Sequence, residues 1–155
     1  MPLDIIRCYR KSWKTTEDQR RAEDYTGGSN LGYKTLLIIG IGGFLGATSR
    51  YYLSGLVRHD NFPYGTLLVN FIGCLVLGLL IFSHIYQGYF SDTTRNFIAI
   101  GLLGSFTTMS TFSYETVRLF NESNIMMGYG NILMNIVLSI SGIYVGRFIV
   151  TSLSI

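Results

Sequence analysis

The sequence predicts an all-α integral membrane protein with four transmembrane helices. Of its 155 residues, 48% are hydrophobic and only 14% are charged, whereas a soluble domain carries about 25% charged residues. The charged residues also leave four long blocks free, residues 35–49, 61–91, 96–114 and 123–146. Each block, extended slightly at its ends, supplies the ~20 apolar residues that a helix needs to cross a ~30 Å hydrocarbon core.

Residues 1–33 form a polar, basic tail, and residues 34–155 form the predicted four-helix domain. The tail has no apolar core followed by a cleavage site, so it does not resemble a signal peptide. Ile6, Tyr9 and Trp13 would share one face of a helix, which suits a helix lying at the membrane interface. A disordered polar tail fits the same residues equally well.

The first span, residues 33–56, is rich in small residues. Gly42 and Gly46 form one pair at i, i+4, and Gly43 and Ala47 form another. Lipid provides no hydrophobic force between helices, so small residues favour association by letting backbones approach closely. This span is therefore predicted to pack tightly against a neighbour.

The second span, residues 64–86, begins after Pro63 and carries Asn70 in an otherwise apolar stretch. An amide in hydrocarbon needs a hydrogen-bonding partner. Asn70 therefore faces either a polar pathway or another helix that it bonds.

The third span, residues 95–120, contains an unusual run of hydroxyl side chains. Six of the nine residues from Ser105 to Ser113 are Ser or Thr, and Gly104 precedes them. A continuous helix could absorb these hydroxyls by bonding them to its own carbonyls. The run also suits a helix broken at mid-membrane, whose freed carbonyls coordinate a cation and whose hydroxyls donate to an anion.

The fourth span, residues 125–153, carries Asn131, Asn135 and Ser139 at i, i+4 and i+8. These residues form one polar stripe on an apolar helix. The stripe predicts either a hydrogen-bonding track for a polar solute or hydrogen bonds to a neighbouring helix.

Several functional classes are disfavoured by the pattern. No nucleophile–base pair or metal-ligand cluster is evident, so the protein is not predicted to be an enzyme. The net charge is +3, but seven of the twelve basic residues lie in residues 1–34, at the start of the first span, which indicates contact with anionic lipid rather than with nucleic acid. Four spans of this size enclose no shielded pathway, so a second subunit is expected.

Three ordered motifs resemble the fluoride channel family, also called the camphor-resistance family. They are residues 42–51 (GGFLGATSRY), 65–73 (GTLLVNFIG) and 104–113 (GSFTTMSTFS), each on its own span. The resemblance covers residues 35–155 and excludes the tail. It implies a passive fluoride-selective channel of the plasma membrane that exports fluoride from the cytoplasm.

The resemblance also implies an architecture and a set of site residues. An antiparallel, dual-topology dimer would hold two fluoride pathways and a central structural sodium ion, bound by the carbonyls of Gly104 and Thr107. Asn70 would be the amide that contacts the anion, with Thr66 one turn before it. Phe112 would turn its electropositive ring edge toward fluoride. The other pore-lining positions would be Met109, Ser110, Thr111, Asn135 and Ser139.

Met109 departs from the family pattern, which has a second phenylalanine at this position. A thioether must fill the place of that ring, or the partner subunit must compensate. The partner is either a second copy of this chain or a paired homologue of opposite orientation.

Two rival functions belong to other classes. A small proton-coupled multidrug exporter can also have four helices, but it needs a carboxylate inside the membrane. The first span has no Asp or Glu, and Glu115 lies near the end of the third. A membrane assembly protein that transports nothing is the second rival.

Overall fold

The computed structural model describes residues 32–57, 61–83 and 88–153, and every regular element within these ranges is a helix. Four helical segments are long and apolar enough to cross a membrane: Tyr33–Leu56, Tyr64–Phe82, Asp92–Asn121 and Ile125–Leu153. The first and last coincide with the predicted spans. The second ends four residues earlier than predicted and the third begins three residues earlier. The predicted all-helical, four-span fold is confirmed.

The chain divides into two units, residues 1–34 and 35–155, and the packing described below belongs to the second. Residues 1–31 of the polar tail lie outside the described residues. The interfacial helix considered for this tail therefore stays a prediction.

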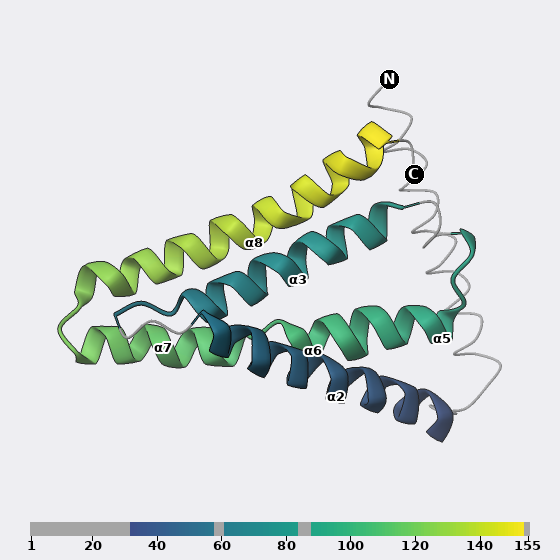
Figure 1. The fold of residues 1–155 in the computed structure, drawn as a ribbon, viewed down its shortest axis with the longest axis horizontal. Helices are drawn as coiled ribbons and strands as arrows, with labels where there is room; N and C mark the ends of the chain where they lie inside the picture. The colour runs from purple at the N-terminus through teal and green to yellow at the C-terminus, as the bar shows by residue number, and fades with distance from the viewer. Residues whose placement is uncertain (1–31, 58–60, 84–87, 154–155) are drawn as a thin grey trace, which may run out of the picture. The chain divides into compact units, whose positions relative to one another are not determined.

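Helices α3 (Tyr64–Phe82) and α8 (Ile125–Leu153) lie side by side (Figure 1). Glycine makes this close packing possible. A Cβ atom on Gly146 would lie 2.6 Å from the Leu75 carbonyl oxygen, and one on Gly78 would lie 2.6 Å from the Ile143 carbonyl oxygen. Real Cβ atoms essentially never come this close to a backbone atom, so the two backbones meet where side chains are missing.

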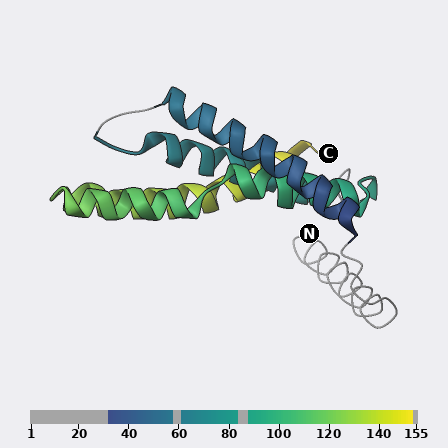
Figure 2. The same cartoon turned by 90° about the horizontal axis from the view of Figure 1, so that it is seen from below.

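Helix α2 (Tyr33–Leu56) packs in the same way on the π-helix η1 (Asn96–Leu103). A Cβ on Gly42 would lie 2.6 Å from the Phe97 carbonyl oxygen, and one on Gly46 would collide with the Leu102 carbonyl oxygen. The predicted close packing through this pair is confirmed. Figures 1 and 2 both show α2 next to this part of the third segment.

The third segment is helical from α5 (Asp92–Arg95) through η1 to α6 (Gly104–Phe106). Two residues then leave the helical conformation: Thr107 has φ −79° and ψ 154°, and Thr108 has φ −147° and ψ 115°. Helix α7 (Met109–Asn121) follows, and the Thr108 hydroxyl caps it by accepting a hydrogen bond from the Thr111 N–H at 3.2 Å.

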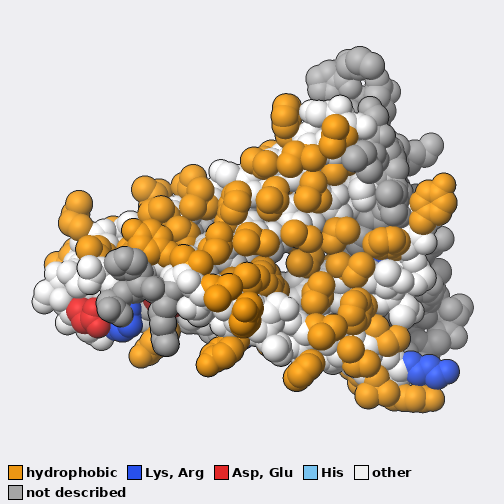
Figure 3. All heavy atoms as spheres, viewed as in Figure 1, with side chains coloured by type: hydrophobic (Ala, Val, Ile, Leu, Met, Phe, Trp, Pro, Cys, Tyr) orange, Lys and Arg blue, Asp and Glu red, His pale blue; other side chains and the backbone are white. Residues whose placement is uncertain are grey.

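The surface of the described residues is largely apolar (Figure 3). Large side chains such as Phe44, Tyr144 and Phe148 are exposed. An exposed apolar surface of this extent is typical of a protein that contacts lipid or another subunit. With four spans, these features indicate a multi-pass membrane protein.

Candidate functional site

Asn70 of α3 bonds both backbone groups of Thr108, one of the two non-helical residues. Its Oδ1 accepts from the Thr108 N–H at 2.8 Å, and its Nδ2 donates to the Thr108 carbonyl at 3.3 Å. Extended backbone inside a hydrocarbon core has no water to bond, and each unsatisfied group costs several kcal/mol. The Asn70 Oδ1 therefore supplies the acceptor that the Thr108 N–H would otherwise find in the helix, and its Nδ2 adds a bond to the Thr108 carbonyl.

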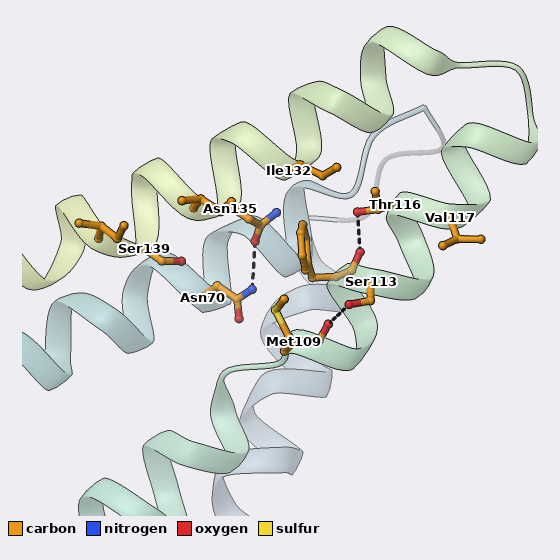
Figure 4. Close-up of a pocket in the computed structure, with 11 residues that line it drawn as sticks. Asn70, Met109, Ser113, Thr116, Val117, Ile132, Asn135 and Ser139 are labelled. Carbon is orange, nitrogen blue, oxygen red and sulfur yellow. Dashed lines mark hydrogen bonds between the residues drawn. The ribbon is translucent and has the colours of Figure 1, made fainter.

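A chain of hydrogen bonds runs from this amide into α8 and back to α7; Figure 4 shows its first bond, between Asn70 and Asn135. Asn70 Nδ2 donates to Asn135 Oδ1 at 3.0 Å, and Asn135 Nδ2 donates to Asn131 Oδ1 at 2.9 Å. Asn131 Nδ2 donates to Thr116 Oγ1 at 2.9 Å, and this hydroxyl donates to the Phe112 carbonyl at 2.8 Å. All five residues are buried, so the polar stripe predicted on the fourth span does bond neighbouring helices.

A pocket of about 600 Å³ lies beside this chain of hydrogen bonds, between α3, α7 and α8. None of its lining residues is charged. Asn70, Ser113, Thr116, Asn135 and Ser139 contribute its polar groups. Most of the pocket surface is apolar, and the Ser113 and Thr116 hydroxyls donate to the Met109 and Phe112 carbonyls. The pocket holds no full opposite charge that would bind an anion too firmly for release.

Phe112 and Met109 both line the pocket, but they differ in burial. The Phe112 side chain is buried, at 7% exposure, whereas Met109 is 72% exposed in the single chain. The sequence-predicted residues Asn70, Met109, Phe112, Asn135 and Ser139 therefore meet at one pocket.

Three other predicted pore residues, Thr66, Thr111 and Ser110, do not line this pocket. Thr66 and Thr111 line a second hollow of about 560 Å³ that also contains Glu115 and Arg118. There the Thr66 hydroxyl donates to Glu115 Oε1 at 2.8 Å. Ser110 lines neither pocket; it is exposed, and its hydroxyl lies 3.2 Å from the Thr108 hydroxyl.

The carbonyls of Gly104 and Thr107 lose their usual helical donors to side chains. In a continuous helix the Thr108 N–H would bond the Gly104 carbonyl and the Thr111 N–H would bond the Thr107 carbonyl. Here the Thr108 N–H donates to Asn70 Oδ1, and the Thr111 N–H donates to Thr108 Oγ1. Both carbonyl oxygens are therefore available to a hard cation, which prefers oxygen ligands.

Asn131, Thr116 and Glu115 were not among the site residues predicted from the sequence. Asn131 was visible only as part of the polar stripe. Thr116 has no signal of its own in the sequence, because its importance comes from facing Asn131 across two helices. Glu115 was noted as a carboxylate near the end of its span, but its partner Thr66 lies on another helix.

The fold and the site define a multi-pass helical membrane protein with an uncharged, largely apolar pocket that holds a few amides and hydroxyls beside two non-helical residues of its third span. Residues 37–147 match the family described as CrcB-like protein, camphor resistance (CrcB). The chain belongs to this family, as its three motifs indicated.

Curated relatives agree with the family match. The chain is 45% identical over 122 residues to fluoride-specific ion channel FluC 3 of Methanosarcina barkeri, covering 77% of this chain and 92% of that protein. It is 51% identical over 115 residues to fluoride-specific ion channel FluC 1 of Methanosarcina acetivorans, covering 73% and 88%. It is 41% identical over 114 residues to the fluoride-specific ion channel FluC of Clostridium novyi, covering 72% and 89%.

Proposed function

We propose that this protein is a passive, fluoride-selective channel of the plasma membrane that exports fluoride from the cytoplasm. The observation that carries the proposal is the uncharged pocket lined by Asn70, Asn135 and three hydroxyl side chains. Fluoride is small and tightly hydrated, so its entry requires donors that replace water. Amides and hydroxyls are such donors, and they release the ion more readily than a buried Lys or Arg would.

The proposed pathway follows the polar groups around Asn70. Both acceptors of its Nδ2 belong to the protein in this structure, Asn135 Oδ1 and the Thr108 carbonyl. An anion must therefore displace one of them to bind the amide. The Phe112 ring would offer its edge, and Ser139 would donate from the opposite wall.

Thr66, Thr111 and Ser110 are proposed to continue the polar path away from this pocket. Thr66 and Thr111 line the second hollow, to which α3 contributes the turn before Asn70 and α7 contributes a different face from the one at the first pocket. Ser110 is exposed at the first turn of α7, where its hydroxyl could face an ion at the surface of this chain.

The channel is proposed to be an antiparallel dimer with two pathways. The 72% exposure of Met109 supports this arrangement, because an exposed residue on a pocket wall leaves that wall to be completed by another subunit. The two extended residues, Thr107 and Thr108, would then lie at mid-membrane, where non-helical backbone is tolerated only if protein buries it or water reaches it.

A structural sodium ion at the centre of the dimer is part of the same proposal. The carbonyls of Gly104 and Thr107, which lack their helical donors, would supply its oxygen ligands. When bound, the cation would neutralise the partial negative charge of these carbonyls and so hold α6 and α7 in place.

Fluoride efflux from liposomes that contain the purified protein tests the proposed function. We expect rapid release of fluoride without a proton gradient, and almost no release of chloride. Chloride flux comparable to fluoride flux would contradict the proposal, as would no flux from protein shown to be folded, both alone and with a paired homologue. Transport that requires a proton gradient would instead favour the exporter, which the family match does not favour.

A further inference from the structure

Asn131 of α8 does not line the pocket beside Asn70, but it belongs to the chain of hydrogen bonds that runs from Asn70 to Phe112. Its side chain is 0% exposed, and it lines neither of the two hollows beside Asn70 and Thr66. It therefore cannot touch an ion in either hollow, and any influence it has on conduction must pass through the residues that it bonds.

Asn131 determines which end of the Asn135 amide faces Asn70. Asn135 Nδ2 donates to Asn131 Oδ1 at 2.9 Å and to the Asn131 backbone carbonyl at 3.1 Å. The nitrogen end of Asn135 is thus held on α8 itself. Only its Oδ1 is left for Asn70, whose Nδ2 donates to it at 3.0 Å.

The groups at the two ends of the hydrogen-bond chain determine the direction in which all its bonds are donated. At one end the Thr108 N–H can only donate, so Asn70 must offer it Oδ1 and turn Nδ2 toward Asn135. At the other end the Phe112 carbonyl can only accept, so the Thr116 hydroxyl donates to it and accepts from Asn131. Reversing any one amide would place two donors or two acceptors face to face. The amide orientations therefore follow from the chemistry of the ends.

We propose that Asn131 is a positioning residue for the Asn70 amide, an inference that rests on the proposed function. Asn131 holds the Asn135 amide so that Asn135 Oδ1 faces Asn70. The Asn70 N–H that donates to this oxygen therefore stays directed along the pocket wall. An entering fluoride replaces Asn135 Oδ1 as the acceptor of an N–H that is already oriented. Such preorganisation lowers the cost of binding.

The test measures the initial fluoride efflux from liposomes as a function of the internal fluoride concentration. Asn131→Leu removes the Oδ1 that accepts from Asn135 and the Nδ2 that donates to Thr116 at nearly constant volume, and it leaves the Asn131 backbone carbonyl in place. We expect the half-saturating fluoride concentration to rise about tenfold, the loss that corresponds to one weakened hydrogen bond to an ion. Asn121→Leu is the matched control, because Asn121 is exposed at the end of α7, and it is expected to match the wild type.

A double variant separates positioning from general damage. If Asn131 acts through Asn70, Asn131→Leu adds no further loss in an Asn70→Ala background. Independent losses that add up would overturn the proposal. A lower melting temperature with an unchanged half-saturating concentration would also overturn it, because that result describes a purely structural residue.

A measurement on the wild-type chain covers the case in which Asn131→Leu does not fold. In protein labelled with ¹⁵N-asparagine, fluoride is titrated while the side-chain amide resonances are followed by NMR. We expect the Asn131 resonance to shift along with those of Asn70 and Asn135 and to saturate at the same concentration. An Asn131 resonance that stays fixed while that of Asn70 moves would refute the inference. Wild-type protein that conducts no fluoride would instead refute the proposed function itself.

Discussion

Asn70 combines a structural and a proposed functional contact in one amide. Its Oδ1 and Nδ2 bond the backbone of Thr108, and the same Nδ2 donates to Asn135 at the pocket. The sequence left open whether Asn70 forms hydrogen bonds between helices or lines a polar pathway. The structure shows the bonds of the first role and the location required by the second.

Replacing Asn70 by Asp is expected to abolish conduction while the protein stays folded. The carboxylate can still accept from the Thr108 N–H. It loses the two bonds that Nδ2 donates and places a negative charge where the anion must pass. At an effective dielectric constant of ~20, two like charges ~4 Å apart repel by about 4 kcal/mol, which is enough to block entry. Fluoride efflux and size-exclusion chromatography of the variant check this. If the carboxylate is demonstrably ionised and efflux stays near the wild-type rate, Asn70 serves only to form hydrogen bonds between helices.

At the scale of elements, glycine decides how the helices meet. Gly42 and Gly46 bring α2 onto η1, while Gly78 and Gly146 bring α3 onto α8. Close backbone approach gains dispersion contacts that lipid does not offer between bulkier helices. Gly73 of α3 has a different role, because it leaves room for side chains of the third segment: a Cβ there would collide with the Thr107 methyl group. The position of the two extended residues thus depends on helix packing as well as on Asn70.

Gly42→Ala and Gly40→Ala form a matched pair on α2. A Cβ at Gly42 would lie 2.6 Å from the Phe97 carbonyl oxygen, whereas one at Gly40 meets nothing within 4 Å. Overpacking of this kind costs about 1–3 kcal/mol, so we expect Gly42→Ala to lower the melting temperature in detergent. Gly40→Ala should leave it unchanged or raise it, because Ala favours the helix more than Gly does. Equal melting temperatures for the two variants would show that α2 does not depend on contact with η1.

At the scale of the whole molecule, basic residues are distributed unequally between the two ends of the spans. Of twelve Lys and Arg residues, seven lie in residues 1–34, and Arg95 and Arg147 belong to the same side. Figure 1 shows that α5, the C-terminal end of α8 and the beginning of α2, which follows the tail in sequence, lie at one end of the four-helix unit. Only Arg50, Arg58 and Arg118 belong to the other side. Basic flanks favour the cytoplasm, so this subunit is expected to insert mainly with its N-terminus inside.

Cysteine labelling in intact cells measures this orientation. In a chain with Cys8 and Cys74 replaced by Ser, a single cysteine introduced in the tail should be protected from an impermeant reagent. A cysteine at Asn124, in the connection between α7 and α8, should react. An antiparallel channel would then need a paired homologue of opposite orientation or a minority of inverted copies. Equal labelled and protected populations at both positions would rule out a fixed orientation.

The sequence by itself determined the number of spans and most of their bounds, because charge-free length and hydropathy are properties of each segment alone. It also determined the family, because three motifs carry that information in order. It found Asn70, Phe112, Met109, Asn135 and Ser139, which the structure brings to one pocket. Each of these residues was recognisable as a polar or motif residue within its own helix.

Only the tertiary structure decided how these residues are connected. Spacing shows which side chains share a helix face, but it does not show which helix that face meets. The place of Thr66 beside Glu115, the Asn131–Thr116 bond and the direction of the amide chain all depend on contacts between α3, α7 and α8. The same is true of the freed Gly104 carbonyl, because a side chain from another helix, Asn70, takes the Thr108 N–H that would bond it in a continuous helix.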